Sequence, residues 1–394
     1  MDVPINWDQF GSSIFVRLMS LLNGNKYTES EDISGMAKNS SMHNAKKKKN
    51  DEYYTEYEDI EKEMNAYHSY DENVFKDKTI LCPCDDPEWS EFTKYFASRF
   101  NKLGLKKLIC TSYAKSVGNK NTTDFEKNSP SYDSEKHEGH GKIFTLTKRE
   151  AKKVNIDDLQ WNYLEGDGDF RSDEVKKLRS EADIIVTNPP FSLFIDFVDW
   201  IMEDNKQFII VGNKNAVTYE NIFPLIRDNK IWIGMRSMNS DFWLRVPNGD
   251  PYEKINDKGV PVKHIMACWY TNIKHGKRFE DFISQCMTME DNLQYNDKLI
   301  ETLSEKWGCH EYPKYDNYDA IEVPHVIDIP SDYDGIMGVP ITFLNNYNPE
   351  QYEIVGCNYS YGRPAGWNEN ISMSSTINGQ SVFKRIFIKK KGGK

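Results

Sequence analysis

The chain has 394 residues, a formal net charge of −11, 38% hydrophobic residues and 13% aromatic residues. This length allows a large core and two domains, and the aromatic content excludes an intrinsically disordered chain. No apolar run approaches the roughly 18 residues that a membrane span requires, so we expect no membrane partner. The acidic charge argues only mildly against a nucleic-acid partner, because binding depends on local basic patches.

The residues 1–43 are predicted to form an N-terminal extension with a short helix at residues 14–22. A second helix is expected within residues 44–67, where apolar residues recur at helical spacing. Thr55 and Glu58 have the spacing of a capping box, so Thr55 is the predicted N-cap. A helix N-terminus here would present N–H groups and a hydroxyl to an anion such as a carboxylate. The alternative is an ordinary amphipathic helix.

A strand at residues 79–87 that stops sharply, a helix at 88–102 and a strand at 105–110 come next. This strand–helix–strand order predicts an α/β fold with a doubly wound sheet. In such sheets ligands bind at the carboxyl ends of the strands. The residues from Cys82 to Asp86 lie at such an end and are therefore candidates for ligand binding.

The residues 114–141 are polar and too long for a simple connection, so we expect a flexible insertion, either disordered or a functional lid. His137 and His140 lie within it, but without a carboxylate or cysteine frame, and we predict no metal site. The next turn contains Asp169, an acceptor for an exocyclic amine, and Phe170, an apolar wall for a ring. The alternative for this turn is an ordinary Asx turn.

The residues Ile184, Ile185 and Val186 predict a buried strand that is stopped by Asn188-Pro189-Pro190-Phe191. The prolines fix the backbone and hold the neighbouring carbonyls rigidly. The Asn188 amide and a fixed carbonyl therefore offer two acceptors to an –NH2 group, and Phe191 offers a flat face for stacking. This motif resembles the catalytic motif of amino-group methyltransferases that use S-adenosylmethionine. The alternative is a proline-rich turn that closes an ordinary strand.

The remaining pattern predicts a catalytic domain at residues 44–273 and a β-rich second domain at 274–394. Helices are predicted at residues 172–180, 193–202, 221–227 and 291–307. Strands are predicted at residues 207–212, 231–233, 241–246, 264–273, 341–344, 352–357 and 382–388. Four residues of the second domain would serve base recognition or pack a small core: Tyr359, Tyr361, Arg363 and Trp367.

Three basic clusters are candidates for phosphate contact, although such charge runs are usually solvated faces. They are Lys46 to Lys49, the group of Lys142, Lys148, Arg149, Lys152 and Lys153, and a basic tail from Lys384 to Lys391. The seven cysteines are scattered, odd in number and without zinc spacing, which favours free thiols in a cytoplasmic protein.

Five stretches taken together resemble the EcoRI-type adenine-specific DNA methyltransferases. They are residues 50–55 (NDEYYT), 82–87 (CPCDDP), 166–170 (GDGDF), 188–191 (NPPF) and 334–341 (DGIMGVPI). The resemblance implies a Rossmann-like methyltransferase sheet followed by a C-terminal target-recognition domain. It also implies S-adenosyl-L-methionine as the cofactor, double-stranded DNA as the partner, and transfer of a methyl group to N6 of a flipped adenine.

The resemblance also assigns roles to individual residues. The Asn188, Pro189, Pro190 and Phe191 motif would hold the target base. Eight residues would bind the cofactor: Tyr54, Thr55, Cys82, Pro83, Asp85, Asp86, Asp169 and Phe170. The first strand lacks the common G-x-G, and the second lacks an acidic residue at Thr111, which leaves Asp85 or Asp86 for the ribose hydroxyls.

Several alternatives stay open at the level of sequence. The same pair of acceptors would serve cytosine N4, an RNA base or a glutamine amide, and Asn188 in the first position of the motif favours adenine only weakly. A DNA-binding module with a catalytically dead methyltransferase fold is the alternative outside enzymes. We further expect a monomer and a possible cognate restriction endonuclease as partner, as the resemblance implies.

Overall fold

The computed structural model describes residues 53–88, 90–114, 129–151, 160–246 and 251–392. The predicted helix at residues 14–22 and the basic cluster from Lys46 to Lys49 lie outside these ranges. Residues 50–394 form one compact unit, to which all the elements below belong. The predicted boundary at residue 274 therefore falls inside this unit and stays a prediction.

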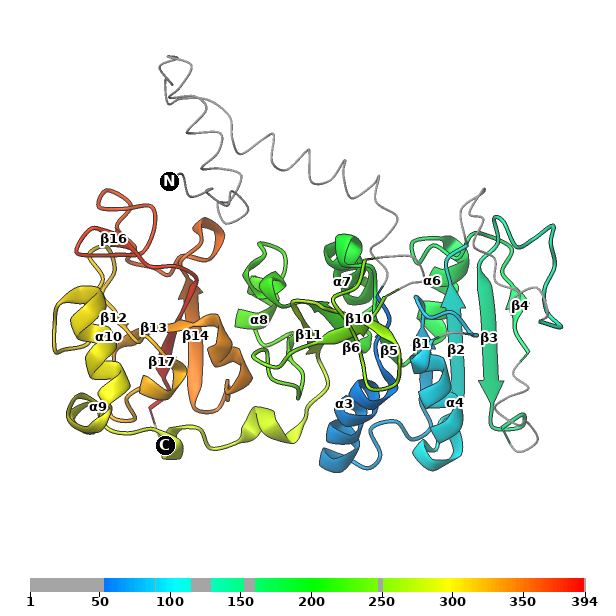
Figure 1. The fold of residues 1–394 in the computed structure, drawn as a ribbon, viewed down its shortest axis with the longest axis horizontal. Coiled ribbons are helices and arrows are strands. Elements are labelled where there is room, and N and C mark those ends of the chain that lie inside the picture. Colours follow the sequence, from blue (N-terminus) through cyan, green and yellow to red (C-terminus); the bar gives the residue numbers. More distant parts are fainter. Residues whose placement is uncertain (1–52, 89, 115–128, 152–159, 247–250, 393–394) are drawn as a thin grey trace, which may run out of the picture. The chain divides into compact units, whose positions relative to one another are not determined.

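The core of the molecule is an eight-stranded mixed sheet with the order β4-β3-β2-β1-β5-β6-β11-β7 (Figure 1). Its strands are β1 (Thr79–Cys82), β2 (Lys107–Ser112), β3 (Lys142–Thr147), β4 (Asn162–Tyr163), β5 (Ile184–Thr187), β6 (Gln207–Asn213), β7 (Trp232–Ile233) and β11 (Ala267–Thr271). The strands β2, β1, β5 and β6 are mutually parallel, whereas β3 and β11 run antiparallel to their neighbours. The predicted α/β fold is confirmed, but β3 was missed because its residues were interpreted as part of a basic cluster.

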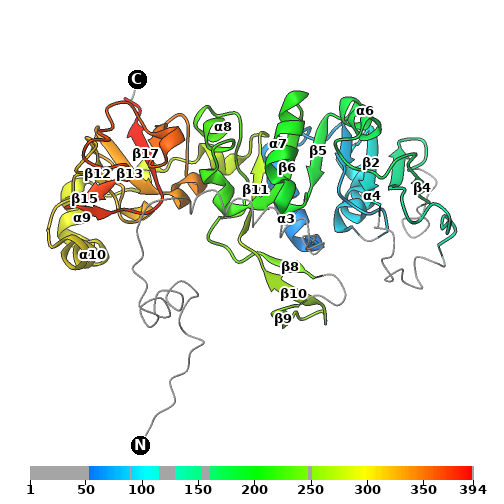
Figure 2. The same ribbon diagram turned by 90° about the horizontal axis from the view of Figure 1, so that it is seen from above.

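Helices cover both faces of this sheet, because the parallel strands are apolar on both sides. The helices α3 and α4 lie on one face, and α6 and α7 on the other (Figure 2). Successive strand residues alternate between two cores: Ile80 and Ile184 face α3 and α4, while Leu81 and Ile185 face α6 and α7. The helices are α3 (Tyr57–Tyr70), α4 (Glu91–Leu103), α6 (Asp173–Glu181), α7 (Phe194–Glu203) and α8 (Phe223–Arg227). None of the helices in the described ranges is long and apolar enough to cross a membrane.

Serine side chains cap two of these helices, as their sequences favour. Ser90 accepts a hydrogen bond from the Phe92 amide at 3.0 Å, and Ser172 accepts one from the Val175 amide at 3.2 Å. The predicted cap at Thr55 is wrong, because α3 begins one residue later than expected and its N-cap is Glu56, without a side-chain cap bond. The backbone before α3 is instead committed to a strand-like pairing with a neighbouring sheet.

That neighbouring sheet is a small antiparallel one with the order β8-β10-β9, drawn beside the main sheet in Figure 2. Its strands are β8 (Trp243–Arg245), β9 (Lys254–Ile255) and β10 (Pro261–His264). Tyr54 extends it on the other side of β8, since its amide and carbonyl exchange hydrogen bonds of 3.0 and 2.9 Å with Arg245. The segment before α3 therefore connects the small sheet to the large one.

The C-terminal part is built around a four-stranded sheet with the order β12-β13-β17-β14. Its elements are α9 (Met289–Tyr295), α10 (Asp297–Trp307), β12 (Ile321–Glu322), β13 (Ile336–Pro340), β14 (Tyr352–Cys357) and β17 (Arg385–Lys390), with a hairpin of β15 (Thr376–Ile377) and β16 (Gln380–Ser381). The strand predicted at residues 341–344 is wrong, because the segment forms the 3-10 helix η8 (Ile341–Asn345). Phe343 and Leu344 are both buried, which a strand with one exposed face would not allow.

The basic and aromatic residues of this part are mostly engaged within the protein. Trp367 stacks on Tyr318 at 5.8 Å and packs against Phe387, so it belongs to a small core. In the basic tail, Arg385 forms a buried ion pair with Glu322. Lys390 pairs with Asp334 at 2.9 Å, and Lys384 donates to the Asn215 side chain at 2.8 Å. Tyr359 and Tyr361 stack on each other with ring centroids 5.7 Å apart, and Arg363 pairs with Glu369.

Candidate active site

The strand order reverses at β1, which lies between β2 and β5. Open α/β sheets bind ligands at the carboxyl ends of the strands beside such a reversal. The residues that follow β1 and β5 meet at this edge, because the Thr187 hydroxyl donates a hydrogen bond to the Asp85 carboxylate at 2.5 Å. The two stretches that the sequence singled out are therefore brought together.

Asp85 connects three elements at this edge. Its carboxylate also accepts a hydrogen bond from the Ser90 hydroxyl at 2.6 Å, and its amide donates to the Thr111 carbonyl at 2.8 Å. The residue is only 5% exposed, and burial raises the pKa of its carboxyl to about 7 despite the two hydroxyl donors. Both carboxylate oxygens are thus used inside the protein, and Asp85 is placed to hold the edge together.

Asp86 belongs to a charged cluster beside the same loop. Lys142 lies 3.1 Å from Asp86 and 2.6 Å from Glu88, and its ammonium sits 4.6 Å from the centre of the Trp161 ring. Burial lowers the pKa of Lys142, but the two carboxylates outweigh it and raise the pKa overall. Lys142 is 5% exposed. Lys142 is therefore not open to phosphate, whereas Lys152 and Lys153 of the same candidate cluster lie outside the described residues.

Cys82 and Pro83 form the end of β1 itself. Cys82 is fully buried and pairs in register with Cys110 of β2, and burial raises the pKa of its thiol well above the usual value. The Pro83 carbonyl accepts a hydrogen bond from the Thr111 hydroxyl at 3.2 Å. These residues shape the backbone of the site.

The Gly-rich turn at residues 166–169 is pressed against the carboxyl end of β2. The Ala114 amide donates to the Asp167 carbonyl at 2.7 Å, and Gly168 has φ +78°. A Cβ atom at Gly168 would lie 2.3 Å from the Ser112 carbonyl oxygen, so only glycine fits there. The turn is therefore fixed at the same edge as the loops after β1 and β5.

Two predicted cofactor residues in this turn have different surroundings. Asp169 accepts hydrogen bonds from the Arg171 amide at 2.8 Å and from its guanidinium at 2.6 Å, which holds the pKa of Asp169 below its usual range. Phe170 is 4% exposed and packs on Phe197 and Trp200 in the core. Its ring therefore anchors the turn in the core, and the role of Phe170 as an apolar wall for a cofactor ring stays a prediction.

Tyr113 is the exposed aromatic residue of this region that sequence analysis missed. It follows β2, is 57% exposed, and its pKa is raised by partial burial and by the nearby carboxylates of Asp167 and Asp169. It was overlooked because it stands at the start of a polar insertion. The available signal in the sequence was an aromatic residue directly after a predicted strand.

The Asn188-Pro189-Pro190-Phe191 motif continues β5 into the 3-10 helix η3 (Phe191–Leu193) and then α7. Pro189 is buried, whereas Asn188, Pro190 and Phe191 are half-buried. The Asn188 side-chain nitrogen donates to the Tyr53 carbonyl at 2.6 Å. Because a carboxamide carries its nitrogen and oxygen on different sides, this bond directs the acceptor oxygen away from Tyr53.

The segment before α3 lies against this motif. Thr55 is 3% exposed, and its hydroxyl has no hydrogen-bond partner within the described part of the chain. A buried hydroxyl without a partner costs roughly 1–3 kcal/mol. Thr55 is therefore a natural place for a polar group of a ligand, while Tyr54 contributes its backbone to the small sheet.

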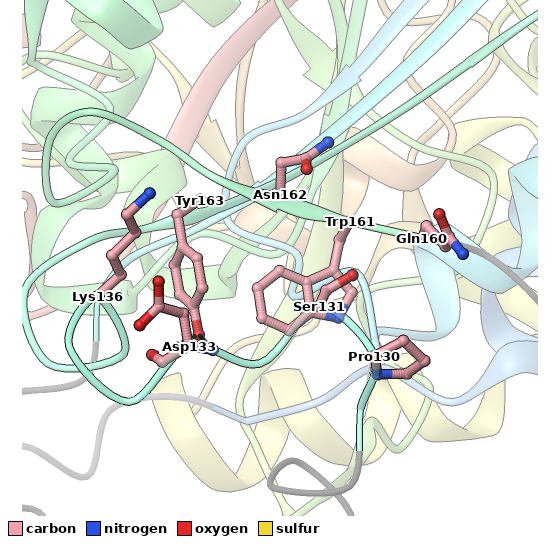
Figure 3. Close-up of a pocket in the computed structure, with 8 residues that line it drawn as sticks. All are labelled: Pro130, Ser131, Asp133, Lys136, Gln160, Trp161, Asn162 and Tyr163. Carbon is pink, nitrogen blue, oxygen red and sulfur yellow. Dashed lines mark hydrogen bonds between the residues drawn. The ribbon is translucent and has the colours of Figure 1, made fainter.

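A separate hollow lies at the outer end of the sheet, beside β4 (Figure 3). It is lined by Pro130, Ser131, Asp133, Lys136, Gln160, Trp161, Asn162 and Tyr163. None of the predicted site residues lines it. In the strand order, β3, β2 and β1 separate β4 from β5. This hollow is therefore distinct from the edge that carries the motif.

No group of three or more His, Cys, Asp and Glu side chains suitable for a metal occurs among the residues the structure describes. His140 uses its Nδ1 atom in a contact of 2.9 Å with the Leu164 carbonyl oxygen. The arrangement at the sheet edge thus offers hydrogen-bond acceptors, a buried hydroxyl and aromatic rings.

The sheet and its edge are consistent with a Rossmann-like methyltransferase fold. The family model for the adenine-specific methyltransferase EcoRI matches residues 41–391, which is most of the chain. The chain belongs to this family, and it is accordingly a DNA methyltransferase.

Three relatives show how far the similarity extends. The chain is 38% identical to the type II methyltransferase M.EcoRI of Escherichia coli, over 90% of this chain and 98% of the relative. It is 35% identical to M.MgeORF184P of Mycoplasma genitalium, over 88% and 97%, and to M.MpnI of Mycoplasma pneumoniae, over 79% and 84%. No solved structure matches the chain.

Proposed function

We propose that the enzyme transfers a methyl group from S-adenosyl-L-methionine to N6 of an adenine flipped out of double-stranded DNA. The observation that carries the proposal is the Asn188 carboxamide, which the Tyr53 carbonyl orients at 2.6 Å at the end of β5. This orientation presents an acceptor oxygen, and the proline that follows fixes the next carbonyl. Two acceptors at fixed positions suit an exocyclic amine.

The residues at the edge fit the cofactor. The buried Thr55 hydroxyl, which has no hydrogen-bond partner among the described residues, would hold its methionine part, with the adjacent Tyr54. The Asp86 loop would face its ribose, since Asp85 is committed to Ser90 and Thr187. Asp169 would accept from its adenine amine beside the exposed Tyr113, while Cys82, Pro83 and Phe170 support the backbone. When bound, S-adenosylmethionine supplies a methyl group on a positively charged sulfur, which leaves as a neutral thioether, and the methylated nitrogen would release one proton to water.

The protein contributes positioning and electrostatics. The adenine N6 lone pair is delocalised into the ring, so the free amine is a weak nucleophile. Hydrogen bonds from N6 to the Asn188 oxygen and the Pro189 carbonyl would favour a tetrahedral nitrogen whose lone pair points outward. Phe191 would stack on the base and offset part of the few kcal/mol that extrusion costs. Holding the reacting atoms in this geometry supplies most of the catalysis.

The decisive experiment is a map of modified bases in the DNA of a host that expresses the chain. The proposal expects N6-methyladenine at one short sequence, and its absence from a host that expresses the Asn188→Ala variant. N4-methylcytosine at a fixed sequence would replace the proposal with its closest alternative. Unmodified DNA, together with retained DNA binding, would favour a dead methyltransferase fold.

The cellular setting follows from the same proposal. The relatives carry type II names, which supports a cognate restriction endonuclease as partner. All seven cysteines are free thiols, which supports a cytoplasmic location. A monomer is also proposed, and sedimentation of the purified chain with and without duplex DNA tests it.

A further inference from the structure

The rings of Tyr53 and Phe191 lie against each other at the Asn188 motif, and the proposed function assigns a role to only one of them. The Phe191 ring belongs to the motif, whereas Tyr53 lies 135 residues away in sequence and contacts Asn188 through its backbone carbonyl. The ring centroids of Tyr53 and Phe191 are 6.5 Å apart, with 36° between the ring planes. Both rings are half-buried.

This separation is close to what a stacked base requires. Bases stack about 3.4 Å apart, so a base with an aromatic ring on each side needs a ring separation of about 6.8 Å. The observed 6.5 Å and the moderate tilt demand only a small adjustment of the two side chains. The Asn188 carboxamide donates to the Tyr53 carbonyl and belongs to the same four-residue motif as Phe191, so it lies where the amine of such a base would require an acceptor.

A cation completes this arrangement. The Lys263 ammonium of β10 lies 5.9 Å from the centre of the Tyr53 ring. No carboxylate pairs with Lys263 within the described ranges, in contrast to Lys258 of the same small sheet region, which pairs with Glu58. The small sheet is tied to this place because Tyr54 and Arg245 exchange backbone hydrogen bonds. When a base flips out of the duplex, the phosphate of its nucleotide moves with it. A lysine beside the stacking ring is placed to bind that phosphate.

We propose that Tyr53 stacks on the face of the flipped adenine opposite Phe191, and that Lys263 binds the backbone phosphate of the same nucleotide. This inference rests on the proposed function, because it assigns the second side of the base site. If it holds, the segment before α3 and the small sheet both take part in substrate recognition. The Tyr53 carbonyl orients Asn188 in every side-chain variant, so substitutions at Tyr53 test the ring alone.

The test uses the full-length chain and a duplex that contains the sequence mapped in its host. Tyr53→Ala should lower kcat/KM about 10- to 100-fold, the range expected for loss of one stacking ring. Tyr53→Phe should stay close to the wild type. A mismatch opposite the target adenine reduces the cost of extrusion, so it should restore most of the kcat/KM that Tyr53→Ala loses. Tyr70→Ala, which removes a half-exposed ring stacked on Phe279, is the matched control for lost packing.

Lys263 is tested by the salt dependence of duplex binding. Lys263→Gln should reduce the slope of log affinity against log salt by about 0.9, the value for one phosphate contact. Lys258→Gln is the matched control from the same region and should leave the slope unchanged.

The outcomes separate this inference from the proposed function. A wild type that methylates no DNA removes both. A wild type that methylates adenine, with Tyr53→Ala equally active, overturns only the stacking role. Equal losses in Tyr53→Ala and Tyr53→Phe, or no rescue by the mismatch, also overturn stacking. An unchanged salt slope in Lys263→Gln overturns the phosphate contact.

Discussion

The loop after β1 and the loop after β5 follow strands of the same length and the same complete burial. Their polar side chains nevertheless have different surroundings. Asp85 is 5% exposed and gives both carboxylate oxygens to hydroxyls of the protein, whereas Asn188 and Phe191 are half-buried. The hydrogen bonds of the first loop hold the sheet edge together, whereas we propose that the second loop presents its groups to a ligand. Proximity to a ligand-binding edge thus does not by itself make a polar residue a ligand contact.

The largest effect is expected at Asn188. Asn188→Ala removes the oriented acceptor and should reduce kcat about 10²- to 10³-fold, as loss of one preorganised hydrogen-bonding group does elsewhere. Binding of S-adenosylmethionine, measured by calorimetry, should stay close to the wild type, because the cofactor is assigned to other residues. Wild-type turnover in this variant would contradict the acceptor role. The loop after β5 would then have no more part in catalysis than the loop after β1.

Asp85 should control the pH dependence of stability. Its pKa of about 7 in the folded protein lies above its ordinary value, so the folded state keeps a proton that the unfolded chain has lost. The free energy of unfolding should therefore fall as pH rises from about 4 to about 7. Asp85→Asn carries no such proton. Its free energy of unfolding, measured by urea unfolding, should therefore rise relative to that of the wild type by up to about 4 kcal/mol between about pH 4 and about pH 7.

A parallel pH dependence in Asp85→Asn and in the wild type would show that other groups dominate. It would also mean that the Asp85 side chain contacts solvent, as the half-buried Asn188 in the loop after β5 does. The comparison is made at constant ionic strength, because screening changes the surface ion pairs.

Phe191 should have the next largest effect on activity. Phe191→Ala removes a stacking surface worth about 1–3 kcal/mol, so kcat/KM should fall about 10- to 100-fold. Phe191→Tyr and Phe191→Trp keep a ring and should retain most activity. Equal losses in all three variants would indicate that the position needs the phenylalanine for packing, which would make this loop structural like the first.

The smallest effect is expected at Thr187, which connects the two loops. Thr187→Val removes the hydroxyl donor to Asp85 and should lower the free energy of unfolding by about 1–2 kcal/mol above pH 7, where Asp85 is ionised. The loss should be smaller near pH 5, because a protonated carboxyl needs the donor less. An equal loss at both pH values would show that the Thr187 hydroxyl does not stabilise the ionised form of Asp85 in particular.

The parallel strands could be predicted from sequence because each is a short β-branched run between turn residues. The strand β3 was not, since its first residue, Lys142, was assigned to a basic surface cluster together with residues that follow the strand. Thr55 fits a capping box by spacing, yet the pairing of Tyr54 with Arg245 keeps the chain extended past it. These errors share one cause, because a local pattern carries no information about the distant segment that pairs with it.

The site residues divide in the same way. The sequence alone determined the rigid strand end at Asn188-Pro189-Pro190-Phe191, because proline geometry and side-chain chemistry are local properties. Only the tertiary structure decided that Asp85 turns inward, that Phe170 anchors its turn in the core, and that Tyr53 orients Asn188. Each of these depends on contacts between residues up to 135 positions apart, which folding creates and no local pattern encodes.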